Sequence, residues 1–437
     1  MDSFIIEGDA RLQGEILISG SKNASLPLMA AALLTDEEVI LEDIPDLRDI
    51  RNMMGLLREL GCEITLDDDG PCRIMHLRTT SQANSHARYE IVRTMRASIC
   101  VLGPLLAKRG LAKVSMPGGC AIGERPIDLH LRGLQSLGAK IHLEAGDITA
   151  DAETLQGVTI FLGGPFGSTV LGTANVMSAA VLAHGVTVIE SAACEPEIVE
   201  LANLLNAMGG QVRGAGTPRI VIEGVSSLHG ARYRVMPDRI EAGTYMIAAA
   251  MTKSNLILRN CPVDCLLSLE DRLQAAGVRT VHHDEPGATS RSSVEVLGAS
   301  VDVILPVQVT TQPFPGFPTD LQAQLLAMLC LADGISVVTE KIYPERFLHV
   351  AELSRMGAHL YRQGPTVVVE GGPSLVGAPV MASDLRASAG LVLAGLAASG
   401  TTIVNRVYHL DRGYEKMEEK LNAAGANIKR VAETDLV

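Results

Sequence analysis

The sequence predicts an α/β protein made of two similar domains, each containing three copies of a strand and helix repeat. Three observations support this prediction: the length of 437 residues, a glycine-centred turn that recurs six times, and a small-residue helix followed by a β-branched strand that recurs between the turns. A chain of this length exceeds what one ordinary hydrophobic core supports, so two large domains are expected.

The glycine-centred turns set the length of the repeat. Each turn follows a helical pattern and precedes an apolar strand residue. The six central residues are Gly61, Gly138, Gly209, Gly277, Gly357 and Gly425. Successive glycines are 68 to 80 residues apart. Because glycine is the usual residue at a left-handed helix end, we expect a helix just before each one, for instance from Ile50 to Leu60 and from Tyr414 to Ala424.

The second repeated element is a helix of small residues that leads into a short β-branched strand. Met246 to Met251 precedes Leu256 to Leu258, and Leu391 to Ala398 precedes Thr401 to Val404. We therefore expect a unit of strand, helix, strand, helix and two strands, used six times. The low aromatic fraction of 3% and the abundant alanine and glycine favour inner helices that pack closely.

Composition restricts the partners of the protein. The net charge of −13 argues against a nucleic-acid or membrane surface, although a local basic cluster can still bind an anionic small molecule. The N-terminal residues lack the basic start and apolar core of a signal peptide, which predicts a cytoplasmic protein. Eight scattered cysteines fit a reducing compartment, and their spacing is wrong for a zinc knuckle, so neither a metal nor another cofactor is expected.

Polar residues stand where the inner helices are predicted to begin. Capping by a hydroxyl explains Ser21, Thr319 and Ser383. It does not explain the cations Lys22, Arg96 and Arg386. Because a cation opposes the dipole of a helix at its N-terminus, three of them in equivalent positions indicate a bound anion.

Cys120 is the cysteine with the most suggestive surroundings. It follows Gly118 and Gly119, and Arg125 lies five residues further on. A nearby cation favours the thiolate, and glycines allow the backbone to approach a ligand closely. From these residues alone, Cys120 is a candidate nucleophile, acid or metal ligand, or an inert thiol.

Six motifs carry a resemblance to a known family. They are Gly20 to Ala24, Thr94 to Ser98, the Cys120 loop through His130, Phe317 to Gln324, Asp384 to Ser388, and Asp411 to Tyr414. In order and spacing they resemble the UDP-N-acetylglucosamine 1-carboxyvinyltransferases, which catalyse the first committed step of peptidoglycan synthesis. The resemblance covers nearly the whole chain.

The resemblance implies an inside-out α/β barrel in each of two domains, with three βαβαββ units per domain, as in EPSP synthase. One enolpyruvyl transferase domain is expected at residues 22–236 and carries the Cys120 loop. The other is expected at residues 1–21 together with 237–437. The N-terminal strand is therefore expected to cross into the second domain.

The implied reaction transfers the enolpyruvyl group of phosphoenolpyruvate to the 3′-hydroxyl of UDP-N-acetylglucosamine and releases phosphate. The family's catalytic positions correspond to Cys120 as the acid, Asp320 as the base, and the cations Lys22 and Arg412. The phosphoenolpyruvate site corresponds to Lys22, Asn23, Arg125, Arg386 and Arg412. The UDP-N-acetylglucosamine site corresponds to Asn23, Arg96, Arg125, Pro126, Ile127, Asp128, Leu129, Ser168, Thr169, Val170, Asp320 and Ile342. Arg346, Asp384 and His409 lie near matching motifs without a firm role.

Two alternatives remain at this point. One is a related enolpyruvyl transferase with another acceptor, such as shikimate 3-phosphate, although that family lacks the Cys120 insert. The other is a catalytically silent paralogue that binds a nucleotide sugar, although Lys22, Cys120, Asp320 and Arg412 are all retained. The sequence leaves the oligomeric state open.

Overall fold

The computed structural model describes residues 2–70, 72–116, 127–283, 292–372 and 374–432. Within these residues the chain divides into two compact units. We call residues 20–116 with 127–236 the N-unit, and residues 2–19 with 237–432 the C-unit. Cys120, Arg125 and Pro126 lie outside the described residues.

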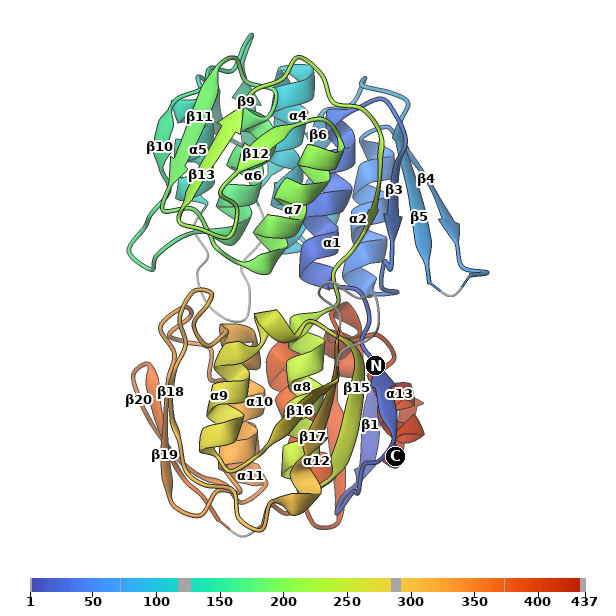
Figure 1. Cartoon of the computed structure of the whole chain (residues 1–437), viewed down its shortest axis with the longest axis vertical. Coiled ribbons are helices and arrows are strands. Elements are labelled where there is room, and N and C mark those ends of the chain that lie inside the picture. The colour runs from blue at the N-terminus through green and yellow to red at the C-terminus, as the bar shows by residue number, and fades with distance from the viewer. Residues whose placement is uncertain (1, 71, 117–126, 284–291, 373, 433–437) are drawn as a thin grey trace. The chain divides into compact units, whose positions relative to one another are not determined.

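Each unit contains three four-stranded sheets with one shared topology (Figure 1). The sheet β10-β11-β13-β12 serves as the example. Its strands are β10 (Thr159–Phe161), β11 (Val186–Glu190), β12 (Gln211–Arg213) and β13 (Arg219–Glu223). Helix α6 (Val170–Ala180) joins the parallel pair β10 and β11, α7 (Pro196–Ala207) leads to β12, and β13 pairs antiparallel with both β11 and β12. This is the predicted βαβαββ unit, and it confirms the repeat.

The same strand order recurs in the other five sheets. In the N-unit, one of these sheets contains in order β14 (Ala231–Arg234), β3 (Val39–Glu42), β5 (Ile74–Thr79) and β4 (Cys62–Asp67). The other contains in order β6 (His86–Ala87), β7 (Leu111–Ser115), β9 (Asp147–Asp151) and β8 (Lys140–Glu144). In the C-unit the first two are β2 (Glu15–Leu17), β15 (Asn255–Cys261), β17 (Ser292–Leu297) and β16 (Thr280–His283), then β18 (Gln308–Thr310), β19 (Ile335–Thr339), β21 (Thr366–Glu370) and β20 (His359–Gln363). The last is β22 (Pro379–Met381), β23 (Thr401–Asn405), β1 (Asp2–Glu7) and β24 (Ile428–Ala432).

Three strands join sheets far from their own position in the chain. Strand β1 lies between β23 and β24, with Phe4 opposite Val404 and Ile6 opposite Ile428, which confirms that the N-terminal strand belongs to the C-unit. Strand β14 supplies the first strand of the first repeat, parallel to β3. Strand β2 does the same for the fourth repeat, parallel to β15. The sequence analysis did not predict the last two exchanges.

The six glycine turns adopt the predicted backbone conformation. Their φ values lie between +87° and +103°, the left-handed region that a residue with a Cβ rarely adopts. The helices that end just before them are α2 (Arg48–Glu59), α5 (Asp128–Ser136), α7, α9 (Leu267–Ala275), α11 (Leu348–Arg355) and α13 (Met417–Ala423). Helix α13 begins three residues later than expected, because Lys416 just before it has a left-handed backbone (φ +48°); a 3-10 turn, η6 (Val407–Arg412), lies further upstream.

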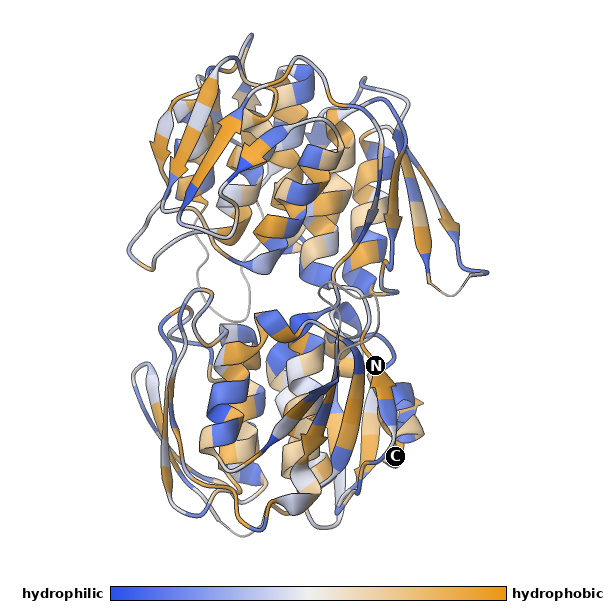
Figure 2. Ribbon diagram, viewed as in Figure 1, coloured by the Kyte–Doolittle hydropathy of each residue, from blue (hydrophilic) through white to orange (hydrophobic). Residues whose placement is uncertain are grey.

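The other helix of each repeat is almost completely buried. These inner helices are α1 (Lys22–Ala31), α4 (Leu102–Arg109), α6, α8 (Arg239–Met251), α10 (Gln322–Leu329) and α12 (Leu385–Ala397). All thirteen residues of α8 are buried. A Cβ on Gly103 of α4 would lie 2.2 Å from the carbonyl oxygen of Asn175 in α6, so these backbones are in direct contact. In Figure 2, hydrophobic residues dominate most strands, whereas the helices carry both hydrophobic and hydrophilic residues.

The predicted helix starts are partly wrong in detail. The Ser21 hydroxyl accepts from the Ala24 N–H at 3.3 Å and caps α1, as expected. Asp384, not Ser383, caps α12, because its Oδ1 accepts from the N–H groups of Arg386 and Ala387. Thr319 caps no helix, because its hydroxyl bonds to Glu340.

The second inner helix also begins differently from the prediction. The Thr94 hydroxyl donates back to the Ile91 carbonyl, so it does not cap a helix. Residues Arg96–Val101 form a 3-10 segment, η2, and α4 follows from Leu102. Among the described residues, no helix is long and apolar enough to cross a membrane.

Candidate active site

The described site residues fall into two groups, one in each unit. The N-unit holds Lys22, Asn23, Arg96, Ile127, Asp128, Leu129, Ser168, Thr169 and Val170. The C-unit holds Asp320, Ile342, Arg386 and Arg412. Most of these residues lie at or beside the beginnings of helices, namely α1, α5, α6, α10 and α12.

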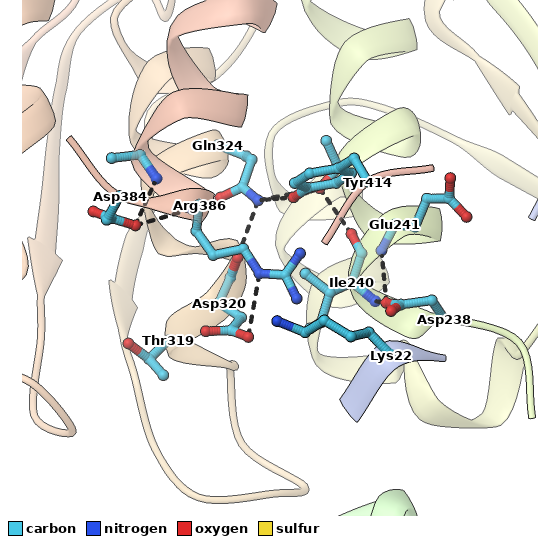
Figure 3. A network of polar contacts seen from close by, with 12 residues as sticks. Lys22, Asp238, Ile240, Glu241, Thr319, Asp320, Gln324, Asp384, Arg386 and Tyr414 are labelled. Atoms are coloured by element: carbon cyan, nitrogen blue, oxygen red, sulfur yellow. Dashed lines mark hydrogen bonds and ion pairs between the residues drawn. The ribbon is translucent and has the colours of Figure 1, made fainter. Parts of the chain in front are cut away.

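Asp320 lies between two arginines of the C-unit. It belongs to the 3-10 turn η5 (Thr319–Leu321), which runs directly into α10. Its Oδ1 accepts from Arg346 Nη1 at 2.8 Å. Its Oδ2 pairs with Arg386 Nε at 3.3 Å, as Figure 3 shows. The Asp320 side chain keeps 26% of its exposure, whereas the two arginine side chains keep 5% and 1%. Two adjacent cations favour the ionised carboxylate, which is the form that accepts a proton.

Arg386 is the second residue of α12 and has unused hydrogen-bond donors. Only its Nε is paired with Asp320, and Nη1 and Nη2 are buried without a hydrogen-bond partner among the described residues. Burial lowers the pKa of Arg386, but the neighbouring Tyr414 and Asp320 raise it more, so the pKa lies above its ordinary value and the residue stays charged. A buried cation with two open N–H groups at a helix N-terminus can bind a carboxylate or a phosphate oxygen.

A polar cluster lies against the guanidinium of Arg386. The ring of Tyr414 lies 5.1 Å from the central carbon of the guanidinium. The Tyr414 hydroxyl bonds to the Thr244 hydroxyl at 2.9 Å and accepts from Gln324 Nε2 at 3.0 Å. Gln324 Nε2 also donates to the backbone carbonyl of Asp320 at 3.0 Å. The cluster therefore links α8, α10 and the segment after η6 next to Asp320 and Arg386.

Arg346 connects Asp320 to a second carboxylate. Its Nη2 lies 3.9 Å from Oδ1 of Asp384, the residue that caps α12. Burial lowers the pKa of Arg346, but the charges of Asp320 and Asp384 outweigh this and raise it overall. Arg346 and Asp384 had no firm role from the sequence alone, and the structure places both near the predicted base.

In the N-unit, Lys22 is the first residue of α1 and is buried. Its Nζ lies 3.3 Å from Oδ2 of Asp49 in the first turn of α2. Lys22 keeps 9% of its side-chain exposure and Asp49 keeps 2%. This carboxylate offsets the unfavourable interaction between the cation and the start of α1. Asn23, the next residue, is half-buried.

Arg96 and the start of α5 lie close enough to interact electrostatically. His130 in the first turn of α5 has its pKa lowered to about 3, mainly by burial and secondarily by the positive charge of Arg96. Its Nδ1 lies 3.0 Å from Nδ2 of Asn175 in α6. The structure thus brings Arg96 near the segment from Ile127 to Leu129, where Ile127 is buried, Leu129 is half-buried and Asp128 is exposed.

The turn before α6 has a structural function of its own. Thr169 caps α6, because its hydroxyl accepts from the Gly172 N–H at 3.2 Å, and Val170 is the first residue of the helix. Ser168 is half-buried just before the cap. Capping therefore accounts for Thr169 without a ligand.

Ile342 and Arg412 are the other two site residues of the C-unit. Ile342 is half-buried in the turn that follows β19, and its N–H donates to Glu340 Oε1 at 2.7 Å. Arg412 is half-buried at the end of η6, two residues before Tyr414. Among the described residues, no group of three or more His, Cys, Asp or Glu side chains is arranged to hold a metal ion.

Comparisons with known proteins agree on one family. Residues 6–421 match the family model of EPSP synthase (3-phosphoshikimate 1-carboxyvinyltransferase). The chain is 50% identical over 431 residues to the UDP-N-acetylglucosamine 1-carboxyvinyltransferase of Methylacidiphilum infernorum, covering 99% of each chain. It is 52% identical over 435 residues to the enzyme of the same name from Dinoroseobacter shibae, covering 99% of this chain and 100% of the relative.

Solved structures share the fold at lower identity. The enolpyruvyl transferase NikO from Streptomyces tendae superposes with a TM-score of 0.86 at 24% identity and covers 98% of this chain and 99% of its own. EPSP synthase from Acinetobacter baumannii gives a TM-score of 0.78 at 19% identity, covering 99% and 100%. These likenesses confirm the predicted two-domain α/β fold of the EPSP synthase type.

Proposed function

The chain belongs to the UDP-N-acetylglucosamine 1-carboxyvinyltransferase family of enolpyruvyl transferases, and from this membership we propose its reaction. It transfers the enolpyruvyl group of phosphoenolpyruvate to the 3′-hydroxyl of UDP-N-acetylglucosamine and releases phosphate. The observation that carries the proposal is the pairing of Asp320 with Arg386, whose Nη1 and Nη2 are buried without a hydrogen-bond partner among the described residues. A base beside a cation with unpaired N–H groups is what an addition to phosphoenolpyruvate needs.

The addition step needs a proton donor and a proton acceptor. Cys120 gives its proton to the methylene carbon of phosphoenolpyruvate, and the 3′-oxygen of the sugar attacks the neighbouring carbon. Asp320 accepts the proton from the sugar hydroxyl. The product of this step is a tetrahedral intermediate. Elimination then removes a proton from the new methyl group and expels phosphate, which restores the double bond in the transferred group.

The cations hold the charged groups of the donor substrate. Lys22, Arg125, Arg386 and Arg412 bind the carboxylate and phosphate of phosphoenolpyruvate, and Asn23 contributes a hydrogen bond. Arginine suits this task because its planar guanidinium bonds two oxygens at once. The open donors of Arg386 and the buried position of Lys22 support the assignment.

Further motif residues are assigned to the acceptor substrate. Asn23, Arg96, the segments 125–129 and 168–170, Asp320 and Ile342 contact UDP-N-acetylglucosamine. The effect of the Arg96 charge on the pKa of His130, in the first turn of α5, supports a shared role for Arg96 and the start of α5.

We assign the two enolpyruvyl transferase domains to residues 22–236 and to residues 1–21 with 237–437. In this role the protein acts in the cytoplasm and commits the sugar nucleotide to peptidoglycan synthesis, and so serves cell shape and cell division. The reaction uses no cofactor. Fosfomycin, which resembles phosphoenolpyruvate in shape and charge, inhibits it by alkylating Cys120.

The test is phosphate release from phosphoenolpyruvate with different acceptors. UDP-N-acetylglucosamine should support turnover, and fosfomycin should stop it. Shikimate 3-phosphate should not replace the sugar nucleotide. Turnover with shikimate 3-phosphate alone would instead show a related transferase with another acceptor, and binding of the sugar nucleotide without any turnover would show a silent paralogue.

A further inference from the structure

Glu340 is a fully buried carboxylate that directly follows β19, and none of the six motifs contains it. Its Oε1 accepts from the Thr311 hydroxyl at 2.7 Å and from the N–H groups of Ile342 at 2.7 Å and Tyr343 at 2.9 Å. Its Oε2 accepts from the Thr319 hydroxyl at 2.9 Å. Glu340 therefore touches both the turn that carries Ile342 and the residue next to Asp320.

The environment of Glu340 is unusual for a buried carboxylate. No lysine, arginine or histidine among the described residues forms an ion pair with it. Burying a charge without a paired cation is costly, and hydrogen bonds must compensate. The four donors supply this compensation. Apolar side chains in place of Glu340 and its side-chain partners would have avoided the cost of burying a charge altogether. The position is therefore better explained by what the carboxylate fixes than by stability.

The hydrogen bonds that link Glu340 to Asp320 form a chain in which each donor and each acceptor is determined. The Thr319 hydroxyl has a single hydrogen, and Glu340 Oε2 accepts it. Thr319 can then only accept from Arg346 Nη1, which lies at 3.0 Å. The same Nη1 donates its other hydrogen to Asp320 Oδ1 at 2.8 Å. Glu340 thus determines the orientation of Thr319, and through it that of Arg346 against Asp320.

We propose that Glu340 is a positioning residue: through Thr319 and Arg346 it fixes the Asp320 carboxylate, and through two backbone N–H groups it fixes the turn that carries Ile342. The inference rests on the proposed function, in which Asp320 accepts the hydroxyl proton and Ile342 contacts the sugar nucleotide. One buried carboxylate then positions both Asp320, the base, and Ile342, which contacts the sugar nucleotide.

The two branches predict different kinetic effects. Thr319→Val removes only the branch to Asp320, so kcat should fall while KM for UDP-N-acetylglucosamine changes little. Thr319→Ser keeps the hydroxyl and should restore kcat. Glu340→Gln keeps an oxygen for the two N–H groups but presents an amide donor to Thr319, which reverses that hydrogen bond. It should therefore reproduce the effect of Thr319→Val.

The experiment measures kcat, KM and melting temperature for wild type, the three single variants and the double variant Glu340→Gln/Thr319→Val. A misplaced catalytic group costs up to about 100-fold, and we expect losses in kcat of about 10- to 100-fold for both disrupting variants. The double variant should be no slower than the slower single variant, because both act on one chain of bonds. The matched control is Thr339→Val, at the residue directly before Glu340. This substitution removes the hydrogen bond between the Thr339 and Thr366 hydroxyls and should leave kcat unchanged.

Crystal structures of wild type and Thr319→Val provide a readout that does not depend on activity. The bond between Arg346 Nη1 and Asp320 Oδ1 should be present in the first and lost or lengthened in the second. An unchanged bond, a wild-type kcat in folded Thr319→Val, or multiplied losses in the double variant would overturn the inference. Wild-type protein that releases no phosphate would overturn the proposed function instead, while the crystallographic comparison still decides the role of Glu340.

Discussion

Replacing Arg386 by methionine should abolish substrate binding without destabilising the free protein. Arg386 is 1% exposed, and its Nη1 and Nη2 are buried without hydrogen-bond partners among the described residues. An Arg386→Met substitution removes these donors, whose burial costs about 1–3 kcal/mol. It also removes a cation from a helix N-terminus, which is worth about 0.3–1 kcal/mol.

The interactions lost in Arg386→Met are of similar size. The ion pair with the partly exposed Asp320 is worth up to about 1 kcal/mol. The contact with the Tyr414 ring is worth about 1–2 kcal/mol. Asp320 is not left unpaired, because Arg346 still holds its Oδ1. The free energy of unfolding without ligand should therefore stay within about 1–2 kcal/mol of wild type, well below the 3–5 kcal/mol of a broken structural ion pair.

The effect of ligand should differ sharply between the two proteins. At 100 times its dissociation constant, phosphoenolpyruvate adds about 2.7 kcal/mol to wild-type stability. For a folding unit of about 150–250 residues this raises the melting temperature by about 5–11 °C. Arg386→Met should lose most of that shift and most of the turnover. Differential scanning calorimetry with and without phosphoenolpyruvate measures both quantities.

Arg109→Met is the matched control for a structural arginine. Its guanidinium donates to the main-chain carbonyls of Asn84 at 2.6 Å and Leu60 at 2.8 Å, so its removal leaves acceptors unsatisfied. It should lower stability by about 2–4 kcal/mol and leave kcat of the folded protein unchanged. A loss of 3–5 kcal/mol in ligand-free Arg386→Met, or an undiminished response to phosphoenolpyruvate, would refute the reasoning.

Three further predictions concern the acid, a buried histidine and helix packing. Cys120→Asp should keep turnover and resist fosfomycin, whereas Cys120→Ala should lose turnover at unchanged melting temperature; an active alanine variant would exclude Cys120 as the acid. Burial, together with the charge of a neighbouring arginine, lowers the pKa of His349 to about 4 from an ordinary 6.5, so its contribution to stability is complete above pH 6.5 and is lost as the pH falls towards 4, by up to about 1.4 kcal/mol per pH unit. His349→Phe should flatten the fall in melting temperature over that range, and an unchanged slope would contradict the assignment. Gly103→Ala should cost about 1–3 kcal/mol by denaturant titration because its Cβ meets a carbonyl oxygen at 2.2 Å, while Gly55→Ala, with nothing within 4 Å of its Cβ, should gain about 0.5–1 kcal/mol; equal effects would contradict the packing argument.

The repeat could be predicted from the sequence because its signals are local. A glycine with positive φ ends each outer helix, and Gly61 and Gly425 mark the first and last of these ends without any tertiary information. The burial of the inner helices follows in the same way from their small and apolar residues. The exchange of β2 and β14 between repeats could not be predicted, because each is a strand of three or four residues whose partner lies about 190 to 240 residues away.

The candidate site shows the same division between local and distant contacts. Asp320 and Arg386 stand in motifs, so the sequence analysis identified them. Glu340 was missed because its side-chain partners Thr311 and Thr319 lie 29 and 21 residues away and no short pattern links them. The choice between Ser383 and Asp384 as the cap of α12 was wrong for a related reason. Both are good capping residues, and the chain places the extended backbone at Asp384.

In the proposed reaction, this protein makes a new ether bond at the 3′-position of UDP-N-acetylglucosamine. The most direct test is to incubate the purified protein with phosphoenolpyruvate and UDP-N-acetylglucosamine and to determine the product by NMR and mass spectrometry. We predict the 3′-enolpyruvyl ether, formed in equal amount to the phosphate released. Phosphate without a modified sugar nucleotide, or an enolpyruvyl group at another position, would contradict this reaction.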